Sequence, residues 1–275
     1  MNLRDFFRPA PSAQVKTLRD AMKGPDRDRI VILDVRQPEE NQRDRIPGSI
    51  LIPLGALPKR MNELDKTRPT YVYCRSGNRS AAAVGLLAGA GFAQVYNVEG
   101  GMFAWDGLVA TGAIGSQMIF LQPGAPFDQV VAAAWAMEEG SAGFYKFVVE
   151  NVKAGKSKAI FEELATAEKA HMDAIRAIYI ALSSDDIAQA TAQYHGEGCC
   201  MEGGVKLSDA IKWAKTASVD DILEFSMGIE ANSYDLYTKL ARDAKDQKTI
   251  AFFKALAEEE WRHLEKMTAR LGLDL

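Results

Sequence analysis

The sequence has few of the features that mark secreted, disulfide-bonded or membrane-spanning proteins. Its 275 residues include three cysteines, too few for a disulfide framework. No apolar run is long enough for a membrane-spanning helix, and the first residues lack the apolar segment of a secretory signal. The formal net charge of −4 argues against a nucleic-acid or anionic-membrane partner. We therefore expect a cytoplasmic protein with reduced thiols that binds neither nucleic acid nor membrane.

The overall composition is that of a folded protein. Hydrophobic residues make up 47% of the chain and charged residues 25%, which predicts packed cores. A chain of 275 residues is long enough to form two domains.

The first part of the chain alternates strand and helix patterns. Short apolar runs at Ile30–Val35, Thr70–Tyr73 and Val95–Val98 predict buried strands. An alanine-rich stretch at Ser80–Gly89 predicts a helix between the last two runs. This alternation predicts an α/β domain over residues 1–111, with a parallel sheet and flanking helices.

The second part of the chain contains only helical patterns. Glycines and prolines mark residues 112–126 as a linker, and we assign residues 127–275 to a second domain. Long amphipathic stretches then cover residues 127–152, 157–183, 218–243 and 246–271. Four such helices, with a long glycine-containing connection between the second and third, predict an all-α four-helix bundle with a crossover.

The bundle region also contains an internal repeat, in which four polar positions recur 92 residues later. The pairs are Glu138 and Glu230, Tyr145 and Tyr237, Glu168 and Glu260, and His171 and His263. Self-similarity at one fixed offset indicates the duplication of a helical hairpin. Glu139 competes with Glu138 for the first position, but only Glu138 obeys the repeat.

Each half of the repeat contains a lone glutamate and a Glu-x-x-His motif. Residues three apart share one face of a helix, so each motif directs both side chains to one point. Carboxylate and neutral imidazole suit iron or manganese, and this set of ligands is the one used by known two-metal carboxylate bundles. A single Glu-x-x-His is typical of a solvated helix face. Here, however, two of only three histidines occupy repeated positions in apolar surroundings, which favours a metal site.

Residues 127–271 resemble the ferritin-like superfamily, and its rubrerythrin branch in particular. The resemblance implies two iron ions, with manganese or zinc as substitutes, an external electron donor and a homodimer. The implied ligands are Glu138, Glu168, His171, Glu230, Glu260 and His263, of which Glu168 and Glu260 would bridge the two ions. Tyr145 and Tyr237 would be hydrogen-bonding neighbours of these ligands.

Two features depart from the rubrerythrin pattern. Three cysteines cannot build the rubredoxin module that this family usually carries. The second glutamate that usually follows the third-helix ligand by three residues is replaced by Ser233, whose repeat partner is Ser141. We therefore expect a symmetric site of the bacterioferritin kind. A catalytic site, an iron-storage module and a dimerisation scaffold with vestigial ligands all remain open for the bundle.

Cys74 lies between a predicted strand and a predicted helix. The loop that follows it consists of Arg75, Ser76, Gly77, Asn78, Arg79 and Ser80. Backbone N–H groups at the start of a helix favour a thiolate, and the two arginines add positive charge. Gly77 permits a tight turn that surrounds an anion. Such a loop would hold a thiolate, a persulfide or an oxyanion.

Cysteine phosphatases and rhodaneses share this strand–loop–helix arrangement. Phosphatases place the arginine six residues after the cysteine, whereas Arg79 follows Cys74 by five. Residues 14–110 resemble the rhodanese family instead. Further matching fragments are Asp34-Val35-Arg36, Ile46-Pro47-Gly48-Ser49 and Glu99-Gly100-Gly101 followed by Trp105.

The rhodanese resemblance implies a sulfurtransferase. Cys74 would take sulfur from thiosulfate or a persulfide donor, form a persulfide and pass the sulfur to a thiol acceptor or to cyanide. Asp34 and Arg36 would brace the loop. Cys199 and Cys200, near His195, would relay sulfur, pass electrons or simply be loop thiols, and the sequence does not choose among these roles.

Overall fold

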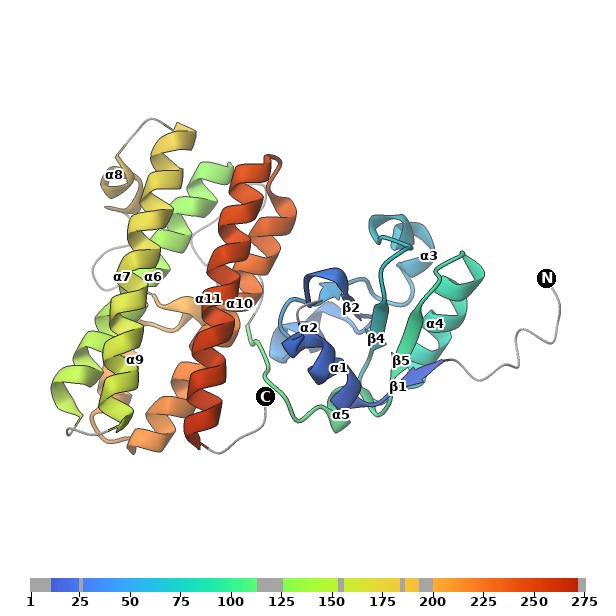
Figure 1. Ribbon diagram of the computed structural model, residues 1–275, viewed down its shortest axis with the longest axis horizontal. Helices are drawn as coiled ribbons and strands as arrows, with labels where there is room; N and C mark the ends of the chain where they lie inside the picture. The colour runs from blue at the N-terminus through green and yellow to red at the C-terminus, as the bar shows by residue number, and fades with distance from the viewer. Residues whose placement is uncertain are drawn as a thin grey trace. The chain divides into compact units, whose positions relative to one another are not determined.

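The computed structural model describes residues 11–24, 27–112, 126–152, 156–183, 186–192 and 200–271. The chain divides into two compact units between Val109 and Ala110. The first unit contains the sheet, and the second contains the long helices (Figure 1). The predicted succession of an α/β domain and an all-α bundle is therefore confirmed.

A five-stranded parallel sheet forms the centre of the first unit, with the strand order β1-β5-β4-β2-β3. The strands are β1 (Ser12–Ala13), β2 (Val31–Asp34), β3 (Ile50–Leu51), β4 (Thr70–Tyr73) and β5 (Val95–Val98). The register pairs Asp34 with Tyr73 at the carboxyl ends of β2 and β4. The segments that follow these two strands therefore begin at the same edge of the sheet.

Short helices flank this sheet. They are α1 (Val15–Lys23), η2 (Arg27–Arg29), α2 (Pro38–Arg43), α3 (Leu57–Arg60), η3 (Met61–Glu63), α4 (Asn78–Gly89) and α5 (Gly101–Ala104). The core contains Leu33 and Val72 from the sheet together with Val84 and Leu87 from α4, all at most 1% exposed. Helix α4 begins two residues earlier than the sequence pattern predicts.

Four long helices form the second unit, and they run alongside one another in Figure 1. They are α6 (Phe127–Asn151), α7 (Lys156–Ser183), α10 (Val219–Asp243) and α11 (Gln247–Leu271). Their ends lie within one residue of those predicted. Helix α10 begins at a capping box, in which the Ser218 hydroxyl accepts a 3.1 Å hydrogen bond from the Asp221 N–H. Within the described ranges, no helix is long and apolar enough to cross a membrane.

The connection between α7 and α10 contains the short helices α8 (Ile187–Thr191), η6 (Glu202–Gly204) and α9 (Leu207–Ala214). An antiparallel bridge joins Cys200 to Lys206, and the Met201 N–H donates a 2.8 Å hydrogen bond to the Val205 carbonyl. These bonds close a turn over residues 200–206, which carries η6.

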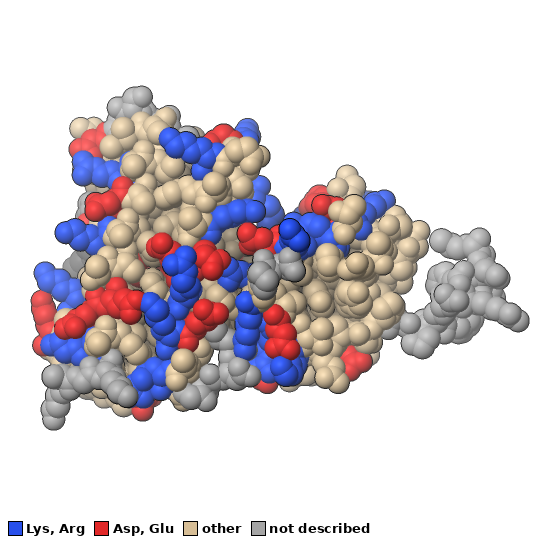
Figure 2. Space-filling model, viewed as in Figure 1, with Lys and Arg blue, Asp and Glu red and all other residues tan. Residues whose placement is uncertain are grey.

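Acidic and basic side chains are interspersed over the face of the helical unit seen in Figure 2. One exposed ion pair on this unit joins Lys266 of α11 to Glu163 of α7. Exposed pairs contribute little to stability because water screens them. The bundle is therefore held together mainly by its buried interior.

Candidate functional site

Cys74 follows β4 directly, at the carboxyl edge of the sheet, and is 1% exposed. The loop after it turns at Gly77, whose φ of 101° is in the left-handed region that favours glycine. This turn brings two donors to the sulfur. The Gly77 N–H lies 3.2 Å from the Cys74 Sγ, and the Ser80 hydroxyl lies 3.4 Å from it.

These donors change the acidity of the thiol. Burial alone raises the pKa of Cys74, because it disfavours the charged form. Hydrogen bonds from the Ser80 hydroxyl and from the backbone N–H groups of Ser76, Gly77 and Ser80 outweigh burial, and the pKa of Cys74 is lowered overall. The loop therefore favours the thiolate, which is the nucleophilic form.

Gly101 lies directly against the backbone of Cys74. A Cβ atom on Gly101 would lie 2.2 Å from the Cys74 carbonyl oxygen, so a larger residue would collide with the backbone. The neighbouring Met102 N–H donates a 2.9 Å hydrogen bond to that oxygen, and the Phe103 N–H donates a 3.0 Å bond to the Arg75 carbonyl. Gly101 and the two residues that follow it thus hold the backbone of Cys74 and Arg75 in place.

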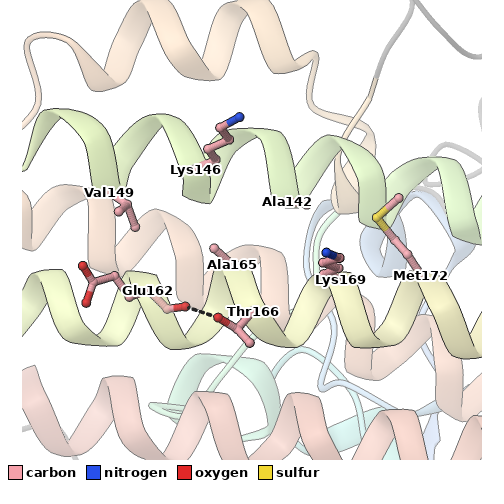
Figure 3. A pocket seen from close by; sticks show the side chains of 8 residues that line it. All are labelled: Ala142, Lys146, Val149, Glu162, Ala165, Thr166, Lys169 and Met172. Carbon is pink, nitrogen blue, oxygen red and sulfur yellow. Dashed lines mark hydrogen bonds between the residues drawn. The ribbon is translucent and has the colours of Figure 1, made fainter.

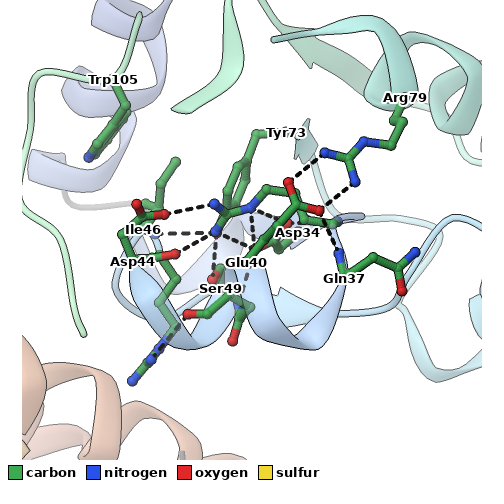
Figure 4. A network of polar contacts seen from close by, with 12 residues as sticks. Asp34, Gln37, Glu40, Asp44, Ile46, Ser49, Tyr73, Arg79 and Trp105 are labelled. Carbon is green, nitrogen blue, oxygen red and sulfur yellow. Dashed lines mark hydrogen bonds and ion pairs between the residues drawn. The ribbon is translucent and has the colours of Figure 1, made fainter. Parts of the chain in front are cut away.

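Arg79 forms two hydrogen bonds of 2.7 Å with the carboxylate of Glu40 on α2 (Figure 4). The hydrogen bond from Arg79 is the main reason that the pKa of Glu40 is lowered to about 2. The positive charge of Arg79 is therefore shared between the loop and Glu40, a partner that the sequence pattern does not reveal. Arg75 instead stacks over the Phe103 ring, 4.7 Å from its centroid.

Asp34 belongs to a buried polar network around α2 (Figure 4), and Arg36 is hydrogen-bonded to it. Nε of Arg36 donates 3.0 Å hydrogen bonds to both Asp34 oxygens, and Nη1 donates a 2.7 Å bond to Asp44. The Asn41 amide adds a 3.0 Å bond to Asp34. These contacts hold α2, and α2 supplies the Glu40 that holds Arg79. A chain of contacts therefore links Asp34 and Arg36 through α2 to Arg79, and their role in bracing the cysteine loop stays a prediction.

The six predicted metal ligands are brought together inside the bundle. Helix α6 carries Glu138, α7 carries Glu168 and His171, α10 carries Glu230, and α11 carries Glu260 and His263. Their exposure ranges from 0% to 7%. Glu139, the competing first position, is not in any of the candidate metal-ligand groups among the described residues.

Five of the six predicted ligands form two adjacent groups that share Glu260, whereas Glu168 lies in a third group with Glu138. In one group, Nδ1 of His171 lies 3.3 Å from Glu138 and 3.1 Å from Glu260. In the other, Nδ1 of His263 lies 2.8 Å from Glu230 and 3.5 Å from Glu260. The ligand atoms of each group lie within 4.8 Å of one another. This arrangement suits two neighbouring ions with Glu260 between them.

Buried carboxylates dominate the electrostatics of the site. Burial raises the pKa of Glu138 and Glu230 well above the usual range. Burial lowers the pKa of His263, but hydrogen bonds with Glu230 and Glu260 outweigh it and raise this pKa to about 10. Glu138 Oε1 and Glu168 Oε2 are buried and form no hydrogen bond within the described residues. Buried acceptors without partners are costly, and metal ions would satisfy these oxygens.

The two tyrosines of the repeat differ in their contacts. The Tyr145 hydroxyl donates a 2.5 Å hydrogen bond to Oε1 of Glu230. The Tyr237 hydroxyl is buried and has no hydrogen-bond partner among the described residues. Among the described residues, Tyr145 but not Tyr237 therefore donates a hydrogen bond to a predicted ligand.

Sequence reasoning missed two acidic residues at this site. Glu202 of η6 is 2% exposed, and its carboxylate groups with Glu138 and Glu168 within 4.8 Å. The expected symmetry of the site is therefore wrong, because one side has an additional carboxylate. Glu259 Oε2 lies 3.0 Å from Nε2 of His171. A proton on Nε2 would leave Nδ1 free to bind a metal.

Of the residues in the glycine-rich connection, His195 and Cys199 lie outside the described residues. Cys200 is 5% exposed, and burial raises the pKa of its thiol. A raised pKa favours the unreactive protonated form. The described residues around Cys200 therefore do not lower the pKa of its thiol as the loop does for Cys74.

A separate cavity of about 410 Å³ lies between α6 and α7 (Figure 3). It is lined by Ala142, Lys146, Val149, Glu162, Ala165, Thr166, Lys169 and Met172. None of the six predicted ligands lines it, so this cavity is distinct from the carboxylate and histidine cluster.

The chain thus combines a buried cysteine whose pKa is lowered with a buried cluster of carboxylates and histidines suited to metal ions. The rubrerythrin family model matches residues 129–271, just over half of the chain, and the rhodanese-like domain model matches residues 15–108. The chain therefore belongs to the rubrerythrin family and carries a rhodanese-like domain.

Several known proteins are similar to part of this chain. A sulfurtransferase of Allochromatium vinosum is 38% identical over 80 residues, which cover 29% of this chain and 75% of that protein. The thiosulfate sulfurtransferase GlpE of Pseudomonas syringae is 32% identical over 99 residues, covering 36% and 87%. The putative sulfur carrier protein YrkF of Bacillus subtilis is 46% identical over 76 residues, and this chain spans only 41% of its length.

Among solved structures, a rhodanese-like domain protein from Staphylococcus aureus is 33% identical to this chain. The match covers 38% of this chain and 99% of that protein, with a TM-score of 0.34 over the comparison.

Proposed function

We propose that this chain is a sulfurtransferase joined to a two-iron oxidoreductase that reduces hydrogen peroxide. The observation that carries the first half is the position of the Cys74 sulfur, which accepts hydrogen bonds from Gly77 and Ser80 at the start of α4. The observation that carries the second half is the convergence of six carboxylate and imidazole ligands in the bundle.

In the sulfur-transfer step, the Cys74 thiolate attacks the outer sulfur of thiosulfate. A Cys74–S bond forms, the bond between the two thiosulfate sulfurs breaks, and sulfite leaves with that electron pair. The product is a Cys74 persulfide anion. The N–H groups that lower the pKa of Cys74 would stabilise its terminal sulfur in the same way. Attack by an acceptor thiolate on that sulfur then releases the Cys74 thiolate and a new persulfide.

Thiosulfate is proposed as the donor because GlpE, a similar protein, is named a thiosulfate sulfurtransferase. Mass spectrometry after incubation with thiosulfate tests the step. We expect Cys74 to gain the mass of one sulfur atom and to lose it when cyanide is added. Cys74→Ser should show no gain. A sulfur found on Cys200 but not on Cys74 would overturn the proposal.

In the bundle, the six ligands would hold two iron ions, which supply two electrons to peroxide when reduced. With two protons, those electrons convert one hydrogen peroxide molecule to two water molecules. The chain itself excludes bulk water through burial, and Tyr145 fixes the orientation of the Glu230 carboxylate. Glu259 holds the His171 ring so that Nδ1 faces the carboxylates.

Repeated turnover distinguishes catalysis from iron storage. We propose that an external electron donor re-reduces the irons and that the chain acts as a homodimer. With a chemical reductant present, successive additions of peroxide should each be consumed by the iron-loaded chain. If iron is oxidised once and later additions persist, the bundle stores iron instead.

A further inference from the structure

Glu202 differs from the six predicted ligands in the element of the fold that carries it. The six lie on the four long helices, whereas Glu202 begins η6 in the turn over residues 200–206. This turn lies in the connection between the two halves of the repeat, so Glu202 has no counterpart generated by the duplication. Its carboxylate nevertheless lies inside the bundle and is 2% exposed.

Two small residues of α6 allow this turn to lie close to the helix. A Cβ atom on Gly140 would lie 2.5 Å from the Cys200 carbonyl oxygen, so only glycine allows the turn to approach this closely. The next residue, Ser141, donates a hydrogen bond from its hydroxyl to Oε2 of Glu202. These two adjacent small residues thus place the turn and orient its carboxylate.

The second half of the repeat lacks both features. The positions equivalent to Gly140 and Ser141 are Asn232 and Ser233. The Ser233 hydroxyl donates a 3.2 Å hydrogen bond to the Ile229 carbonyl of its own helix, not to a carboxylate. The additional acidic group therefore belongs to one side of the site.

Ser141 satisfies only one oxygen of Glu202. The other, Oε1, is buried and has no hydrogen-bond partner within the described residues. The Glu202 carboxylate also lies with those of Glu138 and Glu168, with ligand atoms within 4.8 Å. Three buried carboxylates at such distances repel one another when they are ionised, and a cation between them would offset this repulsion. A purely structural hydrogen bond to Ser141 would not require the Glu202 carboxylate to lie with this group.

We propose that Glu202 is a seventh ligand, which binds the metal ion held by Glu138, Glu168 and His171 and makes the two metal positions unequal. This inference rests on the proposed two-metal function of the bundle. It predicts that the ion on the Glu138 side is bound more tightly than the ion on the Glu230 side.

Anaerobic titration of the metal-free full chain with Co²⁺, followed by calorimetry and visible absorption, tests this inference. The wild-type chain should bind two ions. Glu202→Gln keeps the side-chain shape and removes the charge, so one ion should bind at least about tenfold more weakly and its absorption bands should change. The other ion should be unaffected. Glu162→Gln, an exposed change on α7, should leave both ions unchanged.

The melting temperature of the metal-free variants separates ligation from a structural role. If Glu202 is a ligand, metal-free Glu202→Gln should be at least as stable as the wild type, because a buried like charge has been removed. A fall in melting temperature together with equal weakening of both ions would overturn the inference. Wild-type affinity for both ions in Glu202→Gln would also overturn it while leaving the two-metal function intact. A wild-type chain that binds no Co²⁺ would contradict the proposed function itself.

Discussion

The hydroxyl group of Tyr145 on α6 donates a 2.5 Å hydrogen bond to Oε1 of Glu230 on α10. The bond joins the two halves of the repeat at the metal site. By the same repeat Tyr237 would donate to Glu138, yet the Tyr237 hydroxyl and Glu138 Oε1 both lack hydrogen-bond partners within the described residues. The two tyrosines therefore offer a matched pair of variants.

Tyr145→Phe should destabilise the metal-free chain by about 1–3 kcal/mol, because Oε1 of Glu230 loses its buried hydrogen-bond donor. Tyr237→Phe removes a hydroxyl that has no hydrogen-bond partner within the described residues, so its cost should be clearly smaller. Urea denaturation followed by far-ultraviolet circular dichroism measures both. Equal losses of stability would show that the hydrogen bond from Tyr145 to Glu230 does not stabilise the chain.

Ser80→Ala should shift the pH dependence of sulfur transfer. The Ser80 hydroxyl helps to lower the pKa of Cys74, so the thiolate persists at lower pH than in a free thiol. Removing that donor should raise the pKa and move the midpoint of the rate profile to higher pH. The measurement is the rate of persulfide formation from thiosulfate across the pH range.

Thr67→Ala is a suitable control for this shift, since Thr67 lies in an exposed turn where its hydroxyl bonds to Asp65. Its profile should match the wild type. A Ser80→Ala profile that is unchanged or moved to lower pH would contradict the assigned role of the hydroxyl.

Gly101→Ala should destabilise the first unit by about 2 kcal/mol or more. The new Cβ atom would lie 2.2 Å from the Cys74 carbonyl oxygen, and the φ of 54° is unfavourable for alanine. Pulse labelling with a thiol reagent during denaturation, with Cys74 identified by mass spectrometry, reports the unfolding of this unit.

Gly85→Ala provides the opposite case. Gly85 lies within α4, and its Cβ position has no neighbour within 4 Å, so alanine should stabilise the unit by about 0.5–1 kcal/mol. If both substitutions change stability alike, the close approach of Gly101 to Cys74 is not what constrains the loop.

Metal binding should raise the melting temperature of the bundle, because a ligand that binds only the folded state stabilises it. Ferrous iron added anaerobically should produce this rise, and a chelator should reverse it. Glu230→Gln should abolish most of the effect, whereas Glu224→Gln, an exposed change on the same helix, should retain it. A melting temperature that iron leaves unchanged would favour a dimerisation scaffold.

The positions of the six predicted metal ligands could be inferred from the sequence, because the helix period and the internal repeat determine them. Glu138 and Glu230 stand out through their common offset, and each Glu-x-x-His motif lies on one helix face. These predictions needed no knowledge of how the helices pack against one another.

The remaining contacts depend on tertiary structure. Glu202 lies in a turn without periodicity, and its burial depends on the close approach of that turn to Gly140. In the sequence, Glu259 resembles part of a solvated acidic run. In the structure, the packing of α11 against α7 places its carboxylate beside the His171 ring. Glu40 likewise resembles an ordinary residue of a helix start, and only the packing of α2 reveals its pairing with Arg79.

The most direct test of the central claim mixes the anaerobic, iron-loaded and reduced chain with hydrogen peroxide and, separately, with oxygen. Stopped-flow absorption follows the oxidation of the irons in each case. We predict that peroxide oxidises them much faster than oxygen does, as expected for a peroxide-reducing bundle. Faster oxidation by oxygen would contradict this account and indicate an oxidase or ferroxidase.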